Sequence, residues 1–333
     1  MLKRLFITLS VLVLIVVLYG LYAFSQFPGE PLTVTGELQT HNTDHKGRAR
    51  TYSVYVPAEL EDNAPAVFVL HGSMGSGLGM RAMTGREFDA IADRERLAIV
   101  YPDGFDNHWN GCRGTADYIA NTENIDDIGY LSRVIDELAT RYGIDRTRVY
   151  ITGISNGGHM AYRAALEAPG LFAAHAPVAA SLPAPSTFGC GESGVGVSIA
   201  IFNGTGDPVN PYEGGAVSIL GNSSRGVVRS SQETAHYWRD LAGLTGAGTT
   251  RNLPEIDGDE ATSISEERWG TPGTLEVRHY TLNGSGHTMP SRVAQMPAPL
   301  GGLLGGNAGD ISGPEEIVAF FLGHTLDNPP YQP

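Results

Sequence analysis

Residues 149–160 read Val-Tyr-Ile-Thr-Gly-Ile-Ser-Asn-Gly-Gly-His-Met. The β-branched and aromatic residues at the start of this stretch predict a buried strand over 148–152. A helix is predicted over 156–168, and a sharp turn must join the two. Side chains at positions 153 and 157 would clash with the neighbouring strand and helix in such a turn, and both positions are glycine. We therefore predict that Ser155 lies at the tip of a tight strand-to-helix turn.

Strands and helices alternate on both sides of this turn. The expected strands are 32–38, 50–56, 66–70, 97–101, 148–152, 174–179, 197–203 and 275–282. The expected helices are 80–94, 125–142, 156–168, 228–241 and 314–322. This order predicts an α/β protein with a mostly parallel sheet and helices on both faces, its first two strands forming an antiparallel edge. Two glycine-rich segments, 246–270 and 297–313, are expected to be surface loops.

The bulk composition is that of a globular protein. Of 333 residues, 41% are hydrophobic and 17% are charged, which is enough apolar material for a buried core. The formal net charge of −14 disfavours a nucleic-acid partner, because phosphate binding needs clustered Lys and Arg. We expect residues 26–333 to form a single catalytic domain.

The first 25 residues resemble an export segment. Lys3 and Arg4 precede an apolar run from Leu5 to Phe24, whose length matches a hydrocarbon core about 30 Å thick. We favour an uncleaved membrane anchor, with a cleaved signal peptide as the alternative, in which Ala23 and Ser25 are the two small residues before the cut. Either reading inserts this segment in a membrane during export and places the rest outside the cytoplasm, in an extracellular or periplasmic compartment.

The turn at Ser155 matches the G-x-S-x-G nucleophile elbow. The pentapeptide alone is weak evidence in a chain with 43 glycines. The predicted strand before it and helix after it supply the context in which such a turn raises the serine hydroxyl above a sheet. Ser155 is therefore our candidate nucleophile.

A serine nucleophile needs a base, and the base needs an acid to orient it. His287 follows a late strand in a glycine-flanked loop and is the candidate base. Asp207 follows the strand 197–203, which gives the order Ser, Asp, His expected of such sheets. Asp257 and Asp259 are the competing acids. Structural roles are expected for His71, His159, His175 and His324, with direct catalysis as the alternative for His71.

Two backbone N–H groups should stabilise the oxyanion. One belongs to Asn156, directly after the nucleophile. The other comes from the loop after strand 66–70, either from Ser73 or from the next residue, Met74.

Cys112 and Cys190 are the two cysteines. An oxidising compartment favours a disulfide between them, and two separate buried thiols are the alternative. Neither a CxxC nor an HExxH spacing occurs, so we expect no metal and no cofactor.

Six motifs together resemble one known family. They are His71-Gly72-Ser73, Tyr101-Pro102-Asp103-Gly104 with Trp109, 145–150, Gly153 to Met160, Asn203 to Tyr212, and Gly286-His287-Thr288. This series, in this order, is similar to the poly(3-hydroxybutyrate) depolymerase and feruloyl esterase family of secreted esterases. The resemblance implies an α/β-hydrolase fold and a triad of Ser155, Asp207 and His287.

The resemblance also suggests where substrate selection occurs. Met289 replaces a tryptophan that the family often carries, and we expect it to border the substrate together with Met74 and Trp109. Both cysteines fall in loops that leave the sheet on its ligand-binding side, so we expect a bridge between Cys112 and Cys190 to brace the rim of the site.

The expected reaction is hydrolysis of a carboxylic ester through an acyl-enzyme. Short hydroxyacyl oligoesters and hydroxycinnamoyl esters are the expected substrates. Two alternatives remain, a serine peptidase with the same triad and a membrane-tethered binding module without activity.

Overall fold

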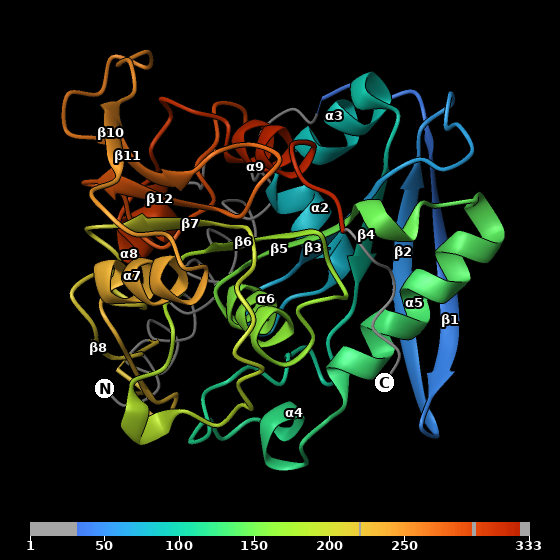
Figure 1. Ribbon diagram of the computed structural model, residues 1–333, viewed down its shortest axis with the longest axis horizontal. Helices are drawn as coiled ribbons and strands as arrows, with labels where there is room; N and C mark the ends of the chain where they lie inside the picture. Colours follow the sequence, from blue (N-terminus) through green and yellow to red (C-terminus); the bar gives the residue numbers. More distant parts are fainter. Residues whose placement is uncertain (1–31, 220, 295–297, 327–333) are drawn as a thin grey trace, which may run out of the picture.

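The structure is a computed structural model that describes residues 32–219, 221–294 and 298–326 (Figure 1). A ten-stranded sheet runs through it in the order β1-β2-β4-β3-β5-β6-β7-β12-β11-β10. Its strands are β1 (Glu37–His45), β2 (Arg48–Val56), β3 (Ala66–Leu70), β4 (Ala98–Pro102), β5 (Val149–Ile154), β6 (Ala174–Val178), β7 (Ile199–Gly204), β10 (Thr249–Asn252), β11 (Ser263–Gly270) and β12 (Glu276–Asn283). The central strands from β4 to β12 pair in parallel, as predicted. A separate short hairpin pairs β8 (Gly215–Ala216) with β9 (Val227–Val228).

The predicted antiparallel edge is confirmed, but its first strand, β1, lies later in the chain than the predicted 32–38. Strands β1 and β2 pair along their whole length, from Glu37 opposite Val56 to His45 opposite Arg48. Lys46 and Gly47 alone make the turn, with φ values of 53° and 75°. Such a two-residue hairpin turn requires left-handed backbone, which glycine adopts without strain.

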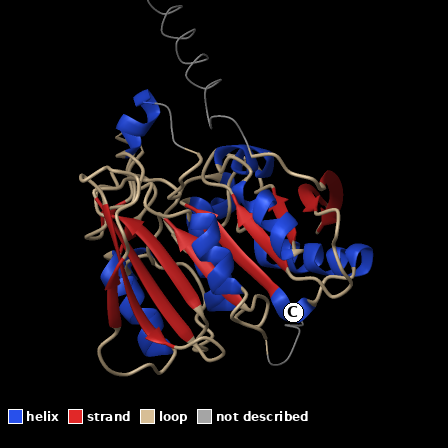
Figure 2. Ribbon diagram, turned by 90° about the horizontal axis from the view of Figure 1, so that it is seen from above, coloured by secondary structure: helices blue, strands red, loops and turns tan. Residues whose placement is uncertain are grey.

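Helices cover both faces of the sheet (Figure 2). They are α2 (Gly77–Met83), α3 (Glu87–Glu95), α4 (Ile119–Thr122), α5 (Asp127–Tyr142), α6 (Asn156–Glu167), α7 (Ser231–Leu241), α8 (Ala298–Leu304) and α9 (Gly313–Phe321). One core cluster joins α2, α3 and α9 to side chains such as Val67 and Val69 of β3. A second joins α5 and α6 to the alternate side chains of β3, Phe68 and Leu70. Because alternate residues of a strand point to opposite faces, these two clusters lie on either side of the sheet.

One predicted helix, 80–94, is two helices in the structure. The chain turns between α2 and α3 at Gly85 and Arg86, which have left-handed φ values of 57° and 64°. The apolar spacing on either side resembles one continuous helix, whereas the left-handed pair interrupts the hydrogen-bond ladder.

The prediction of surface loops at 246–270 and 297–313 was wrong in part. The first segment contains β10 and β11, and β11 pairs with β12 from Ser263 opposite Asn283 to Gly270 opposite Glu276. Strand β11 alternates buried Ile264 and Glu266 with more exposed neighbours, a pattern that its charged residues hide. The second segment contains α8.

The predicted export segment, 1–25, lies outside the described residues. Within the described ranges, no helix combines the length and the apolar character that crossing a membrane requires.

Candidate active site

The predicted site residues follow four strands of the parallel part of the sheet. Ser73 comes after β3, Ser155 after β5, Asp207 after β7 and His287 after β12. The carboxyl ends of parallel strands lie at one edge of a sheet, where ligands bind in open α/β folds. The topology therefore gathers these four residues on one side of the molecule.

Ser155 has the backbone of a nucleophile elbow. Its φ of 56° and ψ of −116° are strained for a residue with a side chain. The Ser155 N–H donates to Val178 O at 2.8 Å, which ties the turn to β6. A Cβ on Gly157 would lie 2.6 Å from Leu70 O, so glycine is required there for β3 and α6 to approach. The helix N-terminus then follows the serine directly, and the hydroxyl is partly exposed.

The carboxylate of Asp207 contacts the imidazole of His287. His287 Nδ1 lies 2.7 Å from Asp207 Oδ2, and both residues are 8% exposed. The second carboxylate oxygen, Oδ1, accepts the backbone N–H groups of Val209 and Asn210 at 2.7 and 2.8 Å. Both oxygens of Asp207 are therefore held, and Nδ1 of the histidine carries the proton that it donates. His287 Nε2 is left to act on a hydroxyl.

The backbone after α8 supports the loop of His287. The His287 N–H donates to Leu304 O at 2.6 Å, and the Gly286 N–H donates to Gly306 O at 3.2 Å. A Cβ on Gly286 would lie 1.8 Å from Leu304 O, so only glycine allows this contact. The segment predicted as a loop thus fixes the position of the candidate base.

In the described part of the chain, no direct hydrogen bond joins Ser155 to His287. Burial, followed by the charges of Arg113 and His287, lowers the pKa of His159 well below its ordinary value. Catalytic hydrogen bonds of this kind are often long without substrate and shorten when it binds.

Two backbone donors are available for an oxyanion. Across the described ranges, neither the Ser73 N–H nor the Asn156 N–H donates to a protein acceptor. The Met74 N–H instead donates to Asn107 O at 2.9 Å, which favours Ser73 over Met74. A Cβ on Gly72 would lie 3.5 Å from Ser155 Cβ, so this loop passes directly beside the serine.

Several known proteins resemble this chain in sequence or in structure. The sequence profile of the prolyl oligopeptidase family matches residues 121–188, which include Ser155 but neither Asp207 nor His287. The chain is 29% identical to the candidate esterase NocK of Nocardia uniformis subsp. tsuyamanensis, over 83% of this chain and 80% of that protein. It is 26% identical to poly(3-hydroxyalkanoate) depolymerase C of Paucimonas lemoignei, over 71% of this chain and 58% of that protein. An acetyl xylan esterase from Aspergillus awamori shares the fold, with a TM-score of 0.54 and 18% identity over 77% of this chain and 95% of that one.

The chain has the α/β-hydrolase fold, and the relatives that it matches are named as esterases or as a depolymerase. The resemblance to depolymerases and feruloyl esterases that the six motifs predict is confirmed by relatives with those names, among them feruloyl esterase B of Thermothelomyces thermophilus, 26% identical over 61% of this chain and 60% of that protein.

A disulfide links Cys112 to Cys190, with the two Cα atoms 5.0 Å apart. The predicted pairing is therefore confirmed, and the alternative of two separate thiols is wrong. Residues beside the bridge also pair, since Arg113 and Phe188 form a β-bridge. The bridge thus joins the loop after β4 to the loop before β7.

The structure buries two of the three residues that are predicted to contact the substrate. Trp109 is fully buried, and its indole N–H donates to His71 O at 3.1 Å, so it supports the loop of Ser73 from beneath. Met289 is 6% exposed and belongs to the core cluster that includes α9. Met74 alone is open to solvent, at 66% exposure. A tryptophan or methionine in a loop motif does not reveal which way its side chain turns.

His71 has the structural role that the sequence favours. Its Nδ1 lies 2.7 Å from Gly72 O, and its Nε2 accepts the Gly104 N–H at 2.9 Å. Both ring nitrogens therefore order the loops at the site, and burial lowers the pKa of the His71 imidazole.

The side chain of Asn156 is a site feature that the sequence analysis missed. Its Oδ1 accepts the Trp109 N–H at 2.7 Å, and its Nδ2 donates to Trp109 O at 2.9 Å and to Tyr118 Oη at 3.0 Å. Asn156 therefore holds the loop after β4 against the elbow. The elbow motif leaves this position unspecified, so no signal in the pattern pointed to it.

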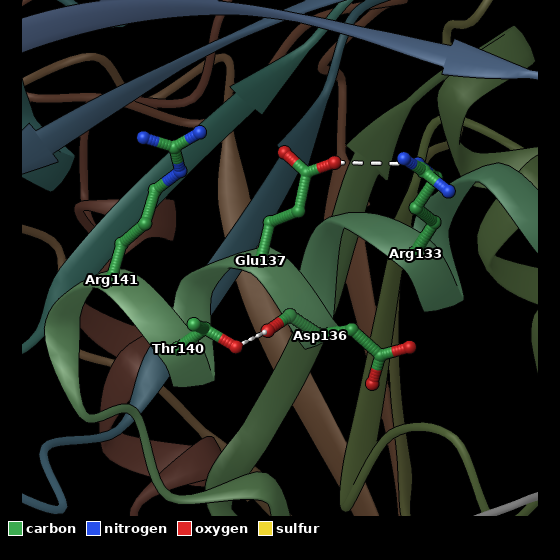
Figure 3. Close-up of a pocket in the computed structure, with 5 residues that line it drawn as sticks. All are labelled: Arg133, Asp136, Glu137, Thr140 and Arg141. Atoms are coloured by element: carbon green, nitrogen blue, oxygen red, sulfur yellow. Dashed lines mark hydrogen bonds and ion pairs between the residues drawn. The ribbon is translucent and has the colours of Figure 1, made fainter.

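Two other features of the structure do not belong to this site. The hollow in Figure 3, of about 530 Å³, is lined by Arg133, Asp136, Glu137, Thr140 and Arg141 of α5 and contains no predicted site residue. Glu255, Asp257 and Asp310 are the one group of described carboxylates close enough to share a cation. Two of them already accept loop N–H groups, Asp257 from Gly309 and Asp310 from Ile256.

Proposed function

We propose that the esterase hydrolyses short hydroxyacyl or hydroxycinnamoyl esters through an acyl-enzyme on Ser155. The hydrogen bond between Asp207 and His287, beside a serine with elbow geometry, carries this proposal. His287 Nε2 accepts the proton of the Ser155 hydroxyl as its oxygen bonds to the ester carbonyl carbon. The protonated imidazole then donates that proton to the departing alcohol, and Asp207 stabilises its positive charge.

The second half of the reaction uses the same groups. His287 accepts a proton from water as the water oxygen bonds to the acyl carbon on Ser155. The bond from that carbon to the Ser155 oxygen then breaks, the acid leaves, and the imidazolium returns its proton to the Ser155 oxygen. The N–H groups of Ser73 and Asn156 stabilise the negative oxygen of both tetrahedral intermediates. Each such donor typically contributes about 3 kcal/mol of transition-state stabilisation.

A fluorophosphonate probe tests the nucleophile. The full-length enzyme should be labelled on Ser155, and the Ser155→Ala variant should not be labelled or active. A panel of 4-nitrophenyl acetate, methyl ferulate and 3-hydroxybutyrate oligomers then ranks the substrates. A wild-type enzyme that the probe leaves unlabelled would refute the proposal and favour the binding module.

Peptide hydrolysis is the second candidate, because the prolyl oligopeptidase profile matches the segment with Ser155. The same panel should include peptide anilides. We expect turnover of aryl esters to exceed that of the anilides, and the reverse order would favour the peptidase.

We also propose that the catalytic domain works outside the cytoplasm. The Cys112–Cys190 disulfide supports this location, since such bonds persist in oxidising compartments. The apolar run Leu5 to Phe24 supports it independently. Cell fractionation with N-terminal sequencing tests the location and tells an anchor from a cleaved signal, and recovery of the enzyme in the cytosol would contradict it.

A further inference from the structure

An arginine without an acidic partner is buried beside the active-site loops. Arg113 is 2% exposed, and in the described residues no carboxylate pairs with it. Its Nη2 donates to Tyr118 Oη at 3.3 Å, and its Nε has no hydrogen-bond partner. Burial lowers the pKa of the Arg113 guanidinium. Buried charges are normally paired, so a buried arginine without a carboxylate partner indicates that a group from outside the protein supplies negative charge nearby.

A second unpaired arginine faces the same place. Arg225 is half-buried in the turn between β8 and β9, and its guanidinium carbon lies 5.8 Å from the centre of the Tyr118 ring. Its Nε is buried without a hydrogen-bond partner, and no described acid forms an ion pair with it. The positive charge of Arg225 also contributes to the lowered pKa of Arg113, behind burial. Tyr118 therefore has a guanidinium bonded to its hydroxyl and another beside its ring.

Both arginines connect to groups that we place in catalysis. Arg225 Nη1 donates to Ser73 Oγ at 2.9 Å, and the Ser73 N–H is a proposed oxyanion donor. Tyr118 Oη, which accepts from Arg113, also accepts from the side chain of Asn156, the residue after Ser155. The pair of charges thus borders the place where the ester carbonyl reacts.

The overall charge of the protein makes this pair unusual. The chain carries a formal net charge of −14, which repels anions at long range. A local pair of unpaired guanidiniums offsets that repulsion and offers planar, two-pronged donors suited to a carboxylate.

We propose that Arg113 and Arg225 form a carboxylate subsite that selects esters with a free acid group on the leaving hydroxyacid. Arg225 contacts the carboxylate, and Arg113 supplies a second positive charge from behind Tyr118. This inference rests on the proposed function and narrows it, because an acid-terminated hydroxyacyl oligoester carries such a group whereas a hydroxycinnamoyl ester of a neutral sugar does not.

A matched substrate pair tests the subsite in the full-length enzyme. The 3-hydroxybutyrate dimer is supplied as the free acid and as its methyl ester, and chromatography follows cleavage of the internal ester. We expect kcat/KM to be higher for the acid by about tenfold or more, the effect of one hydrogen bond to a charged group. Arg225→Gln should reduce this ratio by a similar factor, and Arg225→Lys should reduce it less.

Arg229→Gln is the control. Arg229 directly follows β9, whereas Arg225 precedes it. The Arg229 guanidinium donates to Pro183 O and lies over the Tyr237 ring rather than contacting Ser73. This variant should keep the wild-type ratio. Arg225 is preferred over the fully buried Arg113 for substitution, and the thermal unfolding of each variant shows that it is folded.

The possible outcomes separate the two proposals. Equal kcat/KM for the acid and its methyl ester in the wild type, or an unchanged ratio in Arg225→Gln, would overturn the subsite. If the enzyme is labelled by the fluorophosphonate and cleaves 4-nitrophenyl acetate but neither dimer, the subsite fails while the esterase mechanism stands. Failure of labelling would reject the mechanism itself.

Discussion

His287 donates a hydrogen bond from Nδ1 to Oδ2 of Asp207 at 2.7 Å. The same carboxylate accepts two backbone N–H groups of its own turn through Oδ1. Asp207 is therefore both a turn residue and the partner of the candidate base. The two roles require different oxygens, so they are compatible.

Asp207→Asn should lower kcat for 4-nitrophenyl acetate by about 10⁴-fold, because an amide can favour the wrong imidazole tautomer and cannot stabilise the imidazolium. Asp259→Asn is the matched control, since Asp259 Oδ1 accepts only the nearby Ala261 N–H. Steady-state kinetics of both variants provides the measurement. Near-wild-type kcat in Asp207→Asn would show that another acid orients His287.

Asn156→Leu should lower the free energy of unfolding by about 2–3 kcal/mol, because buried polar groups of Trp109 and Tyr118 lose their partners. It should also reduce kcat, since the loop after β4 is no longer held against the elbow. Urea unfolding and ester kinetics measure the two effects. An Asn156→Leu variant with the same urea midpoint as the wild type would contradict the role that we assign to this side chain.

Gly157→Ala should abolish activity and reduce stability, because the added Cβ would lie 2.6 Å from Leu70 O, a backbone atom of β3. Gly191→Ala is the control, because its Cβ would approach only the Glu167 side chain, at 3.9 Å. Circular dichroism and fluorophosphonate labelling compare the two. An active Gly157→Ala variant would mean that β3 and α6 can separate without cost.

Removing the disulfide should destabilise the enzyme. The bridge closes a loop with a sequence separation of 78, for which chain entropy gives about 4 kcal/mol. Cys190→Ser should lower the thermal unfolding midpoint, and a reducing agent should lower that of the wild type but not that of the variant. Equal midpoints for the wild type with and without reductant would refute a stabilising bridge.

His175→Leu should make stability less sensitive to acid. His175 is fully buried in β6, both its ring nitrogens lack hydrogen-bond partners, and burial lowers its pKa to about 3. A histidine with a pKa lower in the folded state contributes stability that is complete above the unfolded value of 6.5 and is lost as pH falls toward 3.

This single group should account for a loss of about 2 kcal/mol of unfolding free energy between pH 7 and pH 5. Urea titrations at those two pH values measure the loss in the wild type and in His175→Leu. The unfolding free energy of His175→Leu should fall by about 2 kcal/mol less than that of the wild type between the two pH values. Equal losses in the two proteins would show that His175 has the same pKa in the folded and unfolded states.

The sequence was most informative where chemistry imposes a local pattern. The elbow around Ser155 requires glycines at fixed positions, and the strands β3 and β5 are buried along their whole length. These features are visible without any long-range information. The order of Ser155, Asp207 and His287 along the chain then suffices to predict which strand ends carry them.

The sequence was least informative where a side chain depends on distant partners. Trp109 and Met289 were expected at the substrate, yet both pack inward, because His71 O and the α9 core offer them better contacts. Strand β11 was missed because Glu266 is buried there, and Arg251 and Arg278 form ion pairs with it from β10 and β12. No local pattern in the sequence shows that a buried carboxylate is paired with arginines from neighbouring strands.

The contact between the His287 N–H and Leu304 O makes catalysis depend on chain far beyond the base itself. Cleavage of the backbone between the two residues would leave all three triad members covalently attached to the domain. The loop of His287 would nevertheless lose the fixed backbone acceptors that hold it in place. Activity therefore reports whether the segment around Leu304 has docked, and a nascent chain would remain inactive until that segment had folded against the loop of His287.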